Sequence, residues 1–312
     1  MSFPDLFRLP DVALRVVLRL MDLHEAIQFS LCSKKSKNLI KFECRLKYTP
    51  RLSLNHRQKS SYMWIFDAEE PYGSYTFEPR SSPPISDNIR KQIIAEMDQM
   101  PESVKSRKIG DATFTIWEEN LYSEDFSFDY RTFWEDPDAG ILIFVSYLVD
   151  LLGIDVQDLR VTSDSKSIVD WIIRRQNSID KLFYVGKVRE IEAMWPREFR
   201  RRCIDGSNTD LTNEDLNKML LRGDLIHVDI TILGSIDFEM VTRGLNAKKV
   251  EREEPISYVE DPDFSYTIGT SWDYQKDDGT MASVFLIRDD LEGESDFGMV
   301  TWPDSEGNTY DS

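Results

Sequence analysis

The stretch LPDVALRVVLRLMDLHEAIQFSLCSKKSKNLI, residues 9–40, holds the most regular pattern of the chain. Leu9 and Pro10 open it, and proline suits the first turn of a helix because its missing N–H would have no intrahelical partner there. The residues that follow recur at helical spacing and form one broad apolar face, made of Val12, Ala13, Val16, Val17, Leu20 and Met21. The pattern therefore predicts a helix that begins near Pro10.

Two more short helices are predicted directly downstream. Asp22 is a suitable N-cap for a second helix, which carries Ile27 and Phe29 on its apolar side. Ser33 can cap a third helix, whose first turns are basic and whose apolar side contains Ile40. Three short helices can hide only part of their apolar surface from water. We therefore expect the remainder to be covered by the rest of the chain or by a partner.

The three helices, taken in this order, resemble an F-box. The positions that match its motif are Leu9, Pro10, Val17, Leu18, Met21, Ile27, Cys32, Ser33, Lys34 and Lys35. In that family these positions contact, or shape the surface for, the small Skp-type adaptor of cullin-RING ubiquitin ligases, so the resemblance implies an adaptor-binding site here. Ser36 departs from the motif, which has Trp at that place. The alternative is an ordinary N-terminal helical hairpin, because a motif match is a hypothesis.

The resemblance extends to the C-terminal half. The segments LTNEDLNKMLL (211–221) and SWDYQKDDGTMASVFLI (271–287) look like parts of the type 2 F-box-associated domain of nematode F-box proteins. The resemblance then covers residues 3 to about 302, with the F-box at residues 3–47. It implies an F-box at residues 1–50 and a substrate-binding domain at residues 51–312, which ends in an acidic region at 251–312.

The middle of the chain alternates helices with short strands. Helices are expected at residues 141–152, 166–175, 188–195, 212–221 and 235–245. Strands are expected to begin at residues 156, 179, 199 and 225. This spacing is in the range of leucine-rich-type repeats, which stack parallel strands along one face. We therefore predict an α+β fold, with the F-box followed by a divergent leucine-rich-repeat-like α/β solenoid.

Antiparallel strands are expected to flank this body. Before it, strands are predicted at residues 61–67, 73–79, 108–117 and 130–134, together with a helix from about residue 86 to 100. After it, Asp278 and Gly279 supply turn residues that tolerate a positive φ, so a hairpin is predicted between strands 266–274 and 281–287.

Composition limits the class of protein. The 312 residues are 41% hydrophobic, which is ample for a folded core. No stretch reaches the roughly 20 apolar residues of a membrane span, and no signal region begins the chain. The cysteines are few and scattered (Cys32, Cys44, Cys203). We therefore expect a cytoplasmic or nuclear protein in a reducing compartment, with no membrane partner.

Charge is divided unevenly along the chain. Residues 1–50 contain nine Lys and Arg against five Asp and Glu, whereas residues 251–312 contain three against 17. A basic first module suits an acidic adaptor, and an acidic C-terminal region repels nucleic acid. The acidic region favours a basic protein partner, although an ordinary solvated surface has the same composition.

Catalytic motifs are missing from the sequence. His24, His56 and His227 lie far apart, without the Cys or His spacing of a zinc site. Neither a phosphate-binding loop nor a nucleophile elbow occurs. We expect no catalytic residue, no metal and no cofactor. A hydrolase would require titratable side chains that converge in a pocket.

The predicted function is that of a substrate-recognition subunit of an SCF-type cullin-RING E3 ubiquitin ligase. Its expected partners are a Skp-type adaptor, a cullin scaffold and an unidentified protein target, which would be ubiquitinated and degraded by the proteasome. The sequence does not indicate which residues bind that target. The alternative is a non-degradative binding protein or an antidote protein that sequesters its partner, a role known among nematode F-box proteins.

Overall fold

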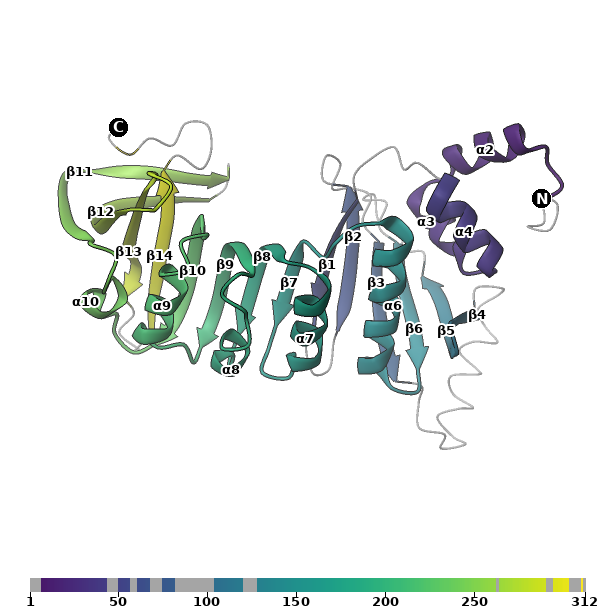
Figure 1. Ribbon diagram of the computed structural model, residues 1–312. Coiled ribbons are helices and arrows are strands. Elements are labelled where there is room, and N and C mark those ends of the chain that lie inside the picture. The colour runs from purple at the N-terminus through teal and green to yellow at the C-terminus, as the bar shows by residue number, and fades with distance from the viewer. Residues whose placement is uncertain are drawn as a thin grey trace. The chain divides into compact units, whose positions relative to one another are not determined.

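The computed structural model describes residues 7–43, 50–56, 61–67, 75–81, 104–119, 128–261, 264–289, 294–302 and 310. The chain divides into two compact units, residues 1–156 and 157–312 (Figure 1). Each unit contains helices and strands and is described by itself below. The helix predicted near residues 86–100 lies outside the described residues.

The three predicted N-terminal helices are present in the first unit, and they fit an F-box. They are α2 (Asp11–Leu20), α3 (Leu23–Ser30) and α4 (Lys34–Glu43). Asp22 caps α3 in a capping box, because its carboxylate accepts from the backbone N–H of Glu25 while the Glu25 side chain accepts from that of Asp22. Ser33 caps α4 by accepting from the backbone N–H of Ser36 at 3.0 Å. Both predicted caps are confirmed.

The remainder of the first unit is a sheet with the strand order β1-β2-β3-β6-β5-β4. Its strands are β1 (Pro50–Asn55), β2 (Tyr62–Asp67), β3 (Tyr75–Ser81), β4 (Val104–Ile109), β5 (Ala112–Glu119) and β6 (Phe128–Trp134). Neighbouring strands are antiparallel, except that β3 and β6 are parallel. The prediction of one strand over residues 108–117 is wrong, because Gly110 has a φ of 59° and turns the chain between β4 and β5.

Helix α6 (Pro137–Leu152) covers one face of this sheet. The Asp136 carboxylate caps its start, and Gly153 ends it with a φ of 68°. The Phe144 ring packs 4.9 Å from that of Phe77 on β3. Gly140 faces Trp134 so closely that a methyl group there would lie 2.4 Å from the indole. The helix and the sheet therefore share one close-packed core.

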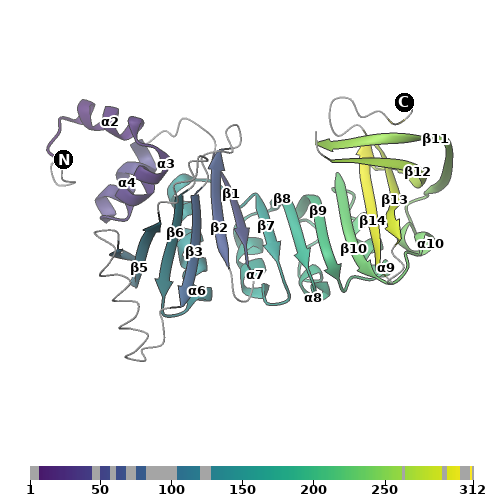
Figure 2. The same cartoon turned by 180° about the vertical axis from the view of Figure 1, so that it is seen from behind.

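The second unit begins with four parallel strands joined by helices. The strands are β7 (Asp158–Val161), β8 (Ser178–Val185), β9 (Arg200–Thr209) and β10 (His227–Leu233). The connecting helices are α7 (Lys166–Arg175), α8 (Arg189–Glu192) and α9 (Asn213–Leu220). They lie on one face of the strands, and the view from behind shows the face without them (Figure 2). The predicted alternation of helix and strand is therefore confirmed.

Antiparallel strands complete the strand set of the second unit, so it is mixed rather than an all-parallel stack of repeats. They are β11 (Lys248–Asp261), β12 (Phe264–Gln275), β13 (Met281–Asp289) and β14 (Glu294–Trp302), in the order β11-β12-β13-β14-β10. The predicted hairpin is confirmed: Gly279 has a φ of 91°, and the Asp278 carboxylate accepts from the backbone N–H of Thr280. The helix expected over residues 235–245 is only α10 (Phe238–Val241), because turns follow it and Gly244 has a φ of 86°.

Strands β11 and β12 contribute to one apolar core with β13 and β14. Its buried members are Ile256, Tyr258, Tyr266, Ile268, Phe285, Val300 and Trp302. The ring of Tyr258 meets that of Trp302 edge-on at 5.2 Å. Aromatic contacts of this kind add to the free energy gained by burying apolar area. This core fixes the position of β12 relative to β13.

Candidate adaptor-binding surface

Helix α2 exposes a row of apolar side chains. Val12, Val16 and Leu20 are 77%, 52% and 67% exposed. They are spaced four residues apart, so they lie on the same side of the helix. We call these three residues the α2 stripe. A single exposed apolar residue is ordinary, but a contiguous row is typical of a surface that binds a partner.

The other side of α2 packs into the first unit. Leu18 is fully buried, while Val17 is partly exposed. Arg15 forms an ion pair with Glu43 of α4, with 3.3 Å between Nε and Oε2. The helix therefore presents the stripe outward from a fixed position.

The ten residues that the F-box motif singled out fall into three groups. Pro10, Cys32, Ser33, Lys34 and Lys35 are exposed. Leu9, Val17 and Met21 are partly exposed. Leu18 and Ile27 are buried in the helical core. The first eight are open to contact with a partner, whereas the buried pair can act only by holding the helices in place.

The basic start of α4 adjoins an aromatic pair. The Lys35 ammonium lies 4.6 Å above the centre of the Phe7 ring, at a distance typical of a cation–π interaction. The Phe7 ring lies 5.8 Å from that of Phe29 on α3. Lys34 is exposed beside them. This end of the helical module therefore combines positive charge with apolar surface.

The opposite side of α4 is anchored to α6. The Asp150 carboxylate binds the ammonium groups of Lys37 and Lys41, at 2.7 and 2.5 Å. These two hydrogen bonds lower the pKa of Asp150 to about 2. The Lys37 ammonium also lies 4.7 Å above the ring of Tyr147. The three helices and the sheet-covering helix therefore belong to the same compact unit and are joined by this contact.

Sequence patterns did not single out the most exposed apolar residues. The stripe was placed in one broad face with Ala13, Val17 and Met21. Phe42 of α4, which is 75% exposed, was placed on the apolar side of the third helix with Ile40. The four-residue spacing of Val12, Val16 and Leu20 was the available signal. This spacing alone could not distinguish the exposed residues of α2 from those that face the core, because that distinction depends on where α3 and α4 pack.

Residues 6–48 match the F-box domain. No curated protein and no solved structure matches the chain. The match covers α2, α3 and α4, and F-box domains typically bind Skp-type adaptors in SCF complexes. The type 2 F-box-associated domain and the nematode resemblance remain predictions.

Ser36, which replaces the Trp of the F-box motif, is buried in the described structure. Its hydroxyl lies 2.8 Å from that of Ser33, the residue that caps α4. A small side chain at this position therefore completes a polar cap, which an indole would not do. The departure from the motif changes a site inside the helical module and leaves the α2 stripe unaltered.

The second unit contains a buried charged cluster. Arg201 is fully buried and binds the Glu192 carboxylate at 2.5 Å, and the hydroxyl of Tyr184 also donates to Glu192. Burial, followed by the charge of Glu192, raises the pKa of Tyr184 well above its usual range. These three residues join α8, which carries Glu192, to β8 and β9. Since these groups are enclosed in the core, they stabilise the fold rather than meet a substrate.

The described residues give no positive sign of a metal centre or a bilayer span. Within them, no group of three or more His, Cys, Asp or Glu side chains is placed to hold a metal ion. None of the helices in the described part of the chain is long and apolar enough to cross a membrane.

Proposed function

We propose that this chain is the substrate-recognition subunit of an SCF-type cullin-RING E3 ubiquitin ligase. In this role α2, α3 and α4 bind a Skp-type adaptor, which connects the chain to a cullin, and residues 51–312 bind a protein target. The main support for this proposal is the F-box match at residues 6–48, in helices that expose the α2 stripe.

The stripe supplies the free energy for adaptor binding in this proposal. Burying apolar area contributes about 25 cal/mol per Å². A helix that lays an apolar row into a groove is a common mode of peptide and protein recognition. Lys34 and Lys35, at the start of α4, would attract an acidic adaptor and increase the rate of association.

The contacts between α4 and α6 would hold the adaptor-binding helices in place within the first unit. Ubiquitin reaches a target lysine only if the target is held within reach of the ligase. Lys37 and Lys41 both bind Asp150, so a displacement of the adaptor-binding helices would have to break two ion pairs. The adaptor-binding surface and the sheet of the first unit would therefore move together.

The chain itself would not carry out chemistry. F-box proteins are generally non-catalytic substrate receptors, and ubiquitin transfer would take place on other subunits. The target would be ubiquitinated and degraded, in the cytoplasm or the nucleus. A sequestering or antidote role would use the same surfaces without degradation.

The test is the affinity of the full chain for a purified Skp-type adaptor. The double variant Val16→Glu/Leu20→Glu should bind at least tenfold more weakly, because it places two charges in an apolar contact. Leu221→Glu is the matched control, since Leu221 is a 44% exposed leucine outside the F-box. Equal affinities of the double variant and the wild type would overturn the proposal.

The variant Leu9→Ala/Pro10→Ala tests the motif positions in the same assay. We expect it to lose adaptor and cullin in affinity purification while retaining a target protein, from cells in which cullin ligases are inhibited. In cells with active cullin ligases, a target whose abundance does not change when adaptor binding is lost would indicate the sequestering role.

A further inference from the structure

Strands β12 and β13 separate and leave a fork in the second unit. Their paired residues run only from Trp272 and Val284 to Gln275 and Met281. The same register would continue with Thr270 opposite Leu286, but the described residues of the two strands show no further pairing. β12 remains paired with β11 and β13 with β14. Within the described part of the chain, each strand therefore has one edge without a strand partner inside the fork.

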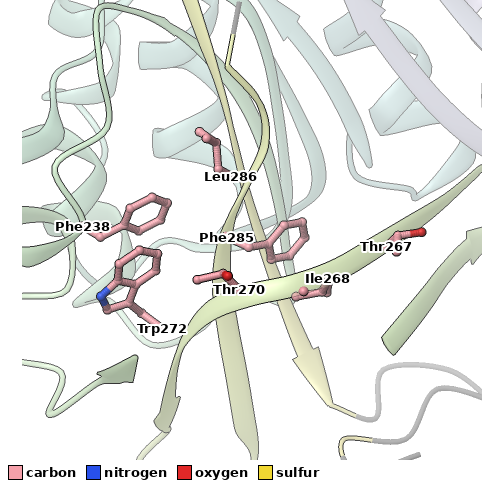
Figure 3. A pocket seen from close by; sticks show the side chains of 8 residues that line it. Phe238, Thr267, Ile268, Thr270, Trp272, Phe285 and Leu286 are labelled. Carbon is pink, nitrogen blue, oxygen red and sulfur yellow. The ribbon is translucent and has the colours of Figure 1, made fainter. Parts of the chain in front are cut away.

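A cavity of about 240 Å³ occupies this fork. It is lined by residues 267–270 of β12, by Phe285 and Leu286 of β13, and by Phe238 and Trp272 at the narrow end. The rings of Phe238 and Trp272 stack in parallel, with 3.8 Å between their centroids. Figure 3 shows these two rings next to each other, with Thr270 on β12 and with Phe285 and Leu286 on β13.

The cavity has a buried floor and an open rim. Ile268 and Phe285 are buried and belong to the core of the unit. Thr267 and Thr270 are exposed, and Leu286 is 40% exposed. The cavity is smaller than the roughly 300–1,000 Å³ of sites that enclose a drug-sized ligand. Its size and shape suit one large apolar side chain.

We propose that the fork binds an extended peptide segment of a protein partner, which inserts one large apolar side chain into the cavity. An unpaired sheet edge is a ready template for another strand. In recognition of this kind, main-chain hydrogen bonds provide affinity and a pocket for a side chain provides specificity. The fork offers both features at the same place.

The charge around the fork favours basic residues beside that apolar side chain, although the Lys249 ammonium lies 5.9 Å from the centre of the Trp272 ring. Phe238 lies between the exposed Asp237 and Glu239. Glu251 lies directly opposite Thr270 in the sheet, although Lys249 binds its carboxylate. The exposed residues 253 and 254 are both glutamates, and they belong to a bulge of β11 that faces Gly269. Lys or Arg in the peptide would be attracted by this rim.

The fork would be the target-binding site of the proposed receptor, so this inference rests on the proposed function. Its test needs no adaptor, and the two can fail independently. Adaptor affinity reports on the α2 stripe, whereas peptide affinity reports on the fork.

The probes are labelled heptapeptides of the form Thr-Lys-Thr-X-Thr-Lys-Thr, in which X is each of the natural residues, and a matched series with Glu in place of Lys. Residues 2, 4 and 6 of an extended peptide lie on one face, so X and both lysines would face the fork. Fluorescence anisotropy measures the affinity of each peptide for the full chain. We expect the highest affinity with Phe, Trp or Leu at X, and an affinity at least tenfold higher in the Lys series than in the Glu series. Hydrogen exchange should slow in residues 265–270 and 285–288 when the best peptide binds.

Two protein variants and one modified peptide decide the outcome. Leu286→Glu should reduce affinity at least tenfold, while the control Leu221→Glu should leave it unchanged and both should keep adaptor binding. N-methylation of residues 3 and 5 of the best peptide removes backbone N–H donors along one edge of the peptide. This modified peptide should bind the wild-type chain more weakly than the unmodified one. The proposal is overturned if no peptide of the Lys series binds better than the Lys-series peptide with Ala at X, or better than the matching peptide of the Glu series. It is equally overturned if Leu286→Glu binds as the wild type does, or if this variant dissociates a wild-type dimer seen by light scattering.

Discussion

Tyr147 on α6 donates a hydrogen bond of 2.8 Å to the hydroxyl of Ser30 on α3. Both side chains are buried, and Ser30 donates in turn to the carbonyl of Ile27 at 2.6 Å. Burial raises the pKa of Tyr147 to about 12, so the phenol keeps its proton at neutral pH. This chain of bonds ties the second F-box helix to the helix that covers the sheet of the first unit.

Tyr147→Phe should lower the free energy of unfolding by about 1 kcal/mol, because it removes one buried hydrogen bond and leaves the ring in place. Chemical denaturation measures the loss. Adaptor affinity should stay within twofold of the wild-type value, since the variant does not touch the α2 stripe. A variant of unchanged stability that no longer bound adaptor would contradict this division.

Asp150 should make stability depend on acid pH. Its folded pKa of about 2 lies below the ordinary value near 4, so its contribution is present above about pH 4 and disappears as the pH falls to about 2. The side chain is 44% exposed, and solvent screening holds the contribution below about 1 kcal/mol. Unfolding of the wild type and of Asp150→Asn, measured between these pH values, should converge at the acid end. A constant difference would show that the ion pairs are not responsible.

Leu18 and Leu20 are two residues apart and should behave oppositely. Leu18→Ala removes a fully buried side chain and should cost about 2–5 kcal/mol of stability. Leu20→Ala alters an exposed side chain and should change stability by less than about 0.5 kcal/mol, yet weaken adaptor binding. Thermal melts and adaptor titrations of the two purified variants separate these effects. A strongly destabilised Leu20→Ala would place that residue in the core.

Gly140→Ala should destabilise the first unit by about 1–3 kcal/mol, because the new methyl group would lie 2.4 Å from the Trp134 ring in a packed core. Gly269→Ala is the control, since the nearest atom to its methyl group would be Pro255 Cγ, at 3.8 Å. Denaturant unfolding of both variants gives the comparison, and equal stabilities would argue against the close packing of α6 on β6.

The buried Arg201–Glu192 pair should show strong coupling. Arg201→Met leaves the Glu192 carboxylate in the core without that partner and should cost about 3–5 kcal/mol. Adding Glu192→Leu should recover part of the loss, because it removes a buried carboxylate whose remaining ion-pair partner is Arg222, at 3.4 Å. A double-mutant cycle measured by unfolding quantifies the coupling. Additive losses would mean that the two groups act separately.

Short-range signals made the helices predictable. The capping box at Asp22 directly precedes the helix that it starts, and α7 follows its predicted limits from Lys166 to Arg175. The turn at Asp278 and Gly279 is equally local. Such signals depend only on residues that are close together along the chain, so they can be recognised in the sequence.

Long-range pairing explains part of what was missed. Strands β11 and β14 were not predicted. β14 pairs with β10, about 65 residues away, as well as with β13. β11 pairs with β12, the next strand along the chain, so its pairing is local. The fork has no sequence signal either, because it arises where two strands of one predicted hairpin take different partners.

The sequence by itself determined the three N-terminal helices, their caps and their resemblance to an F-box, because periodicity and capping act over a few residues. Only the tertiary structure decided that Leu18 is buried while Val12, Val16 and Leu20 are exposed. All four are apolar residues of one helix, and its packing against the rest of the first unit selects which of them lose contact with water. The same packing leaves the others available to a partner.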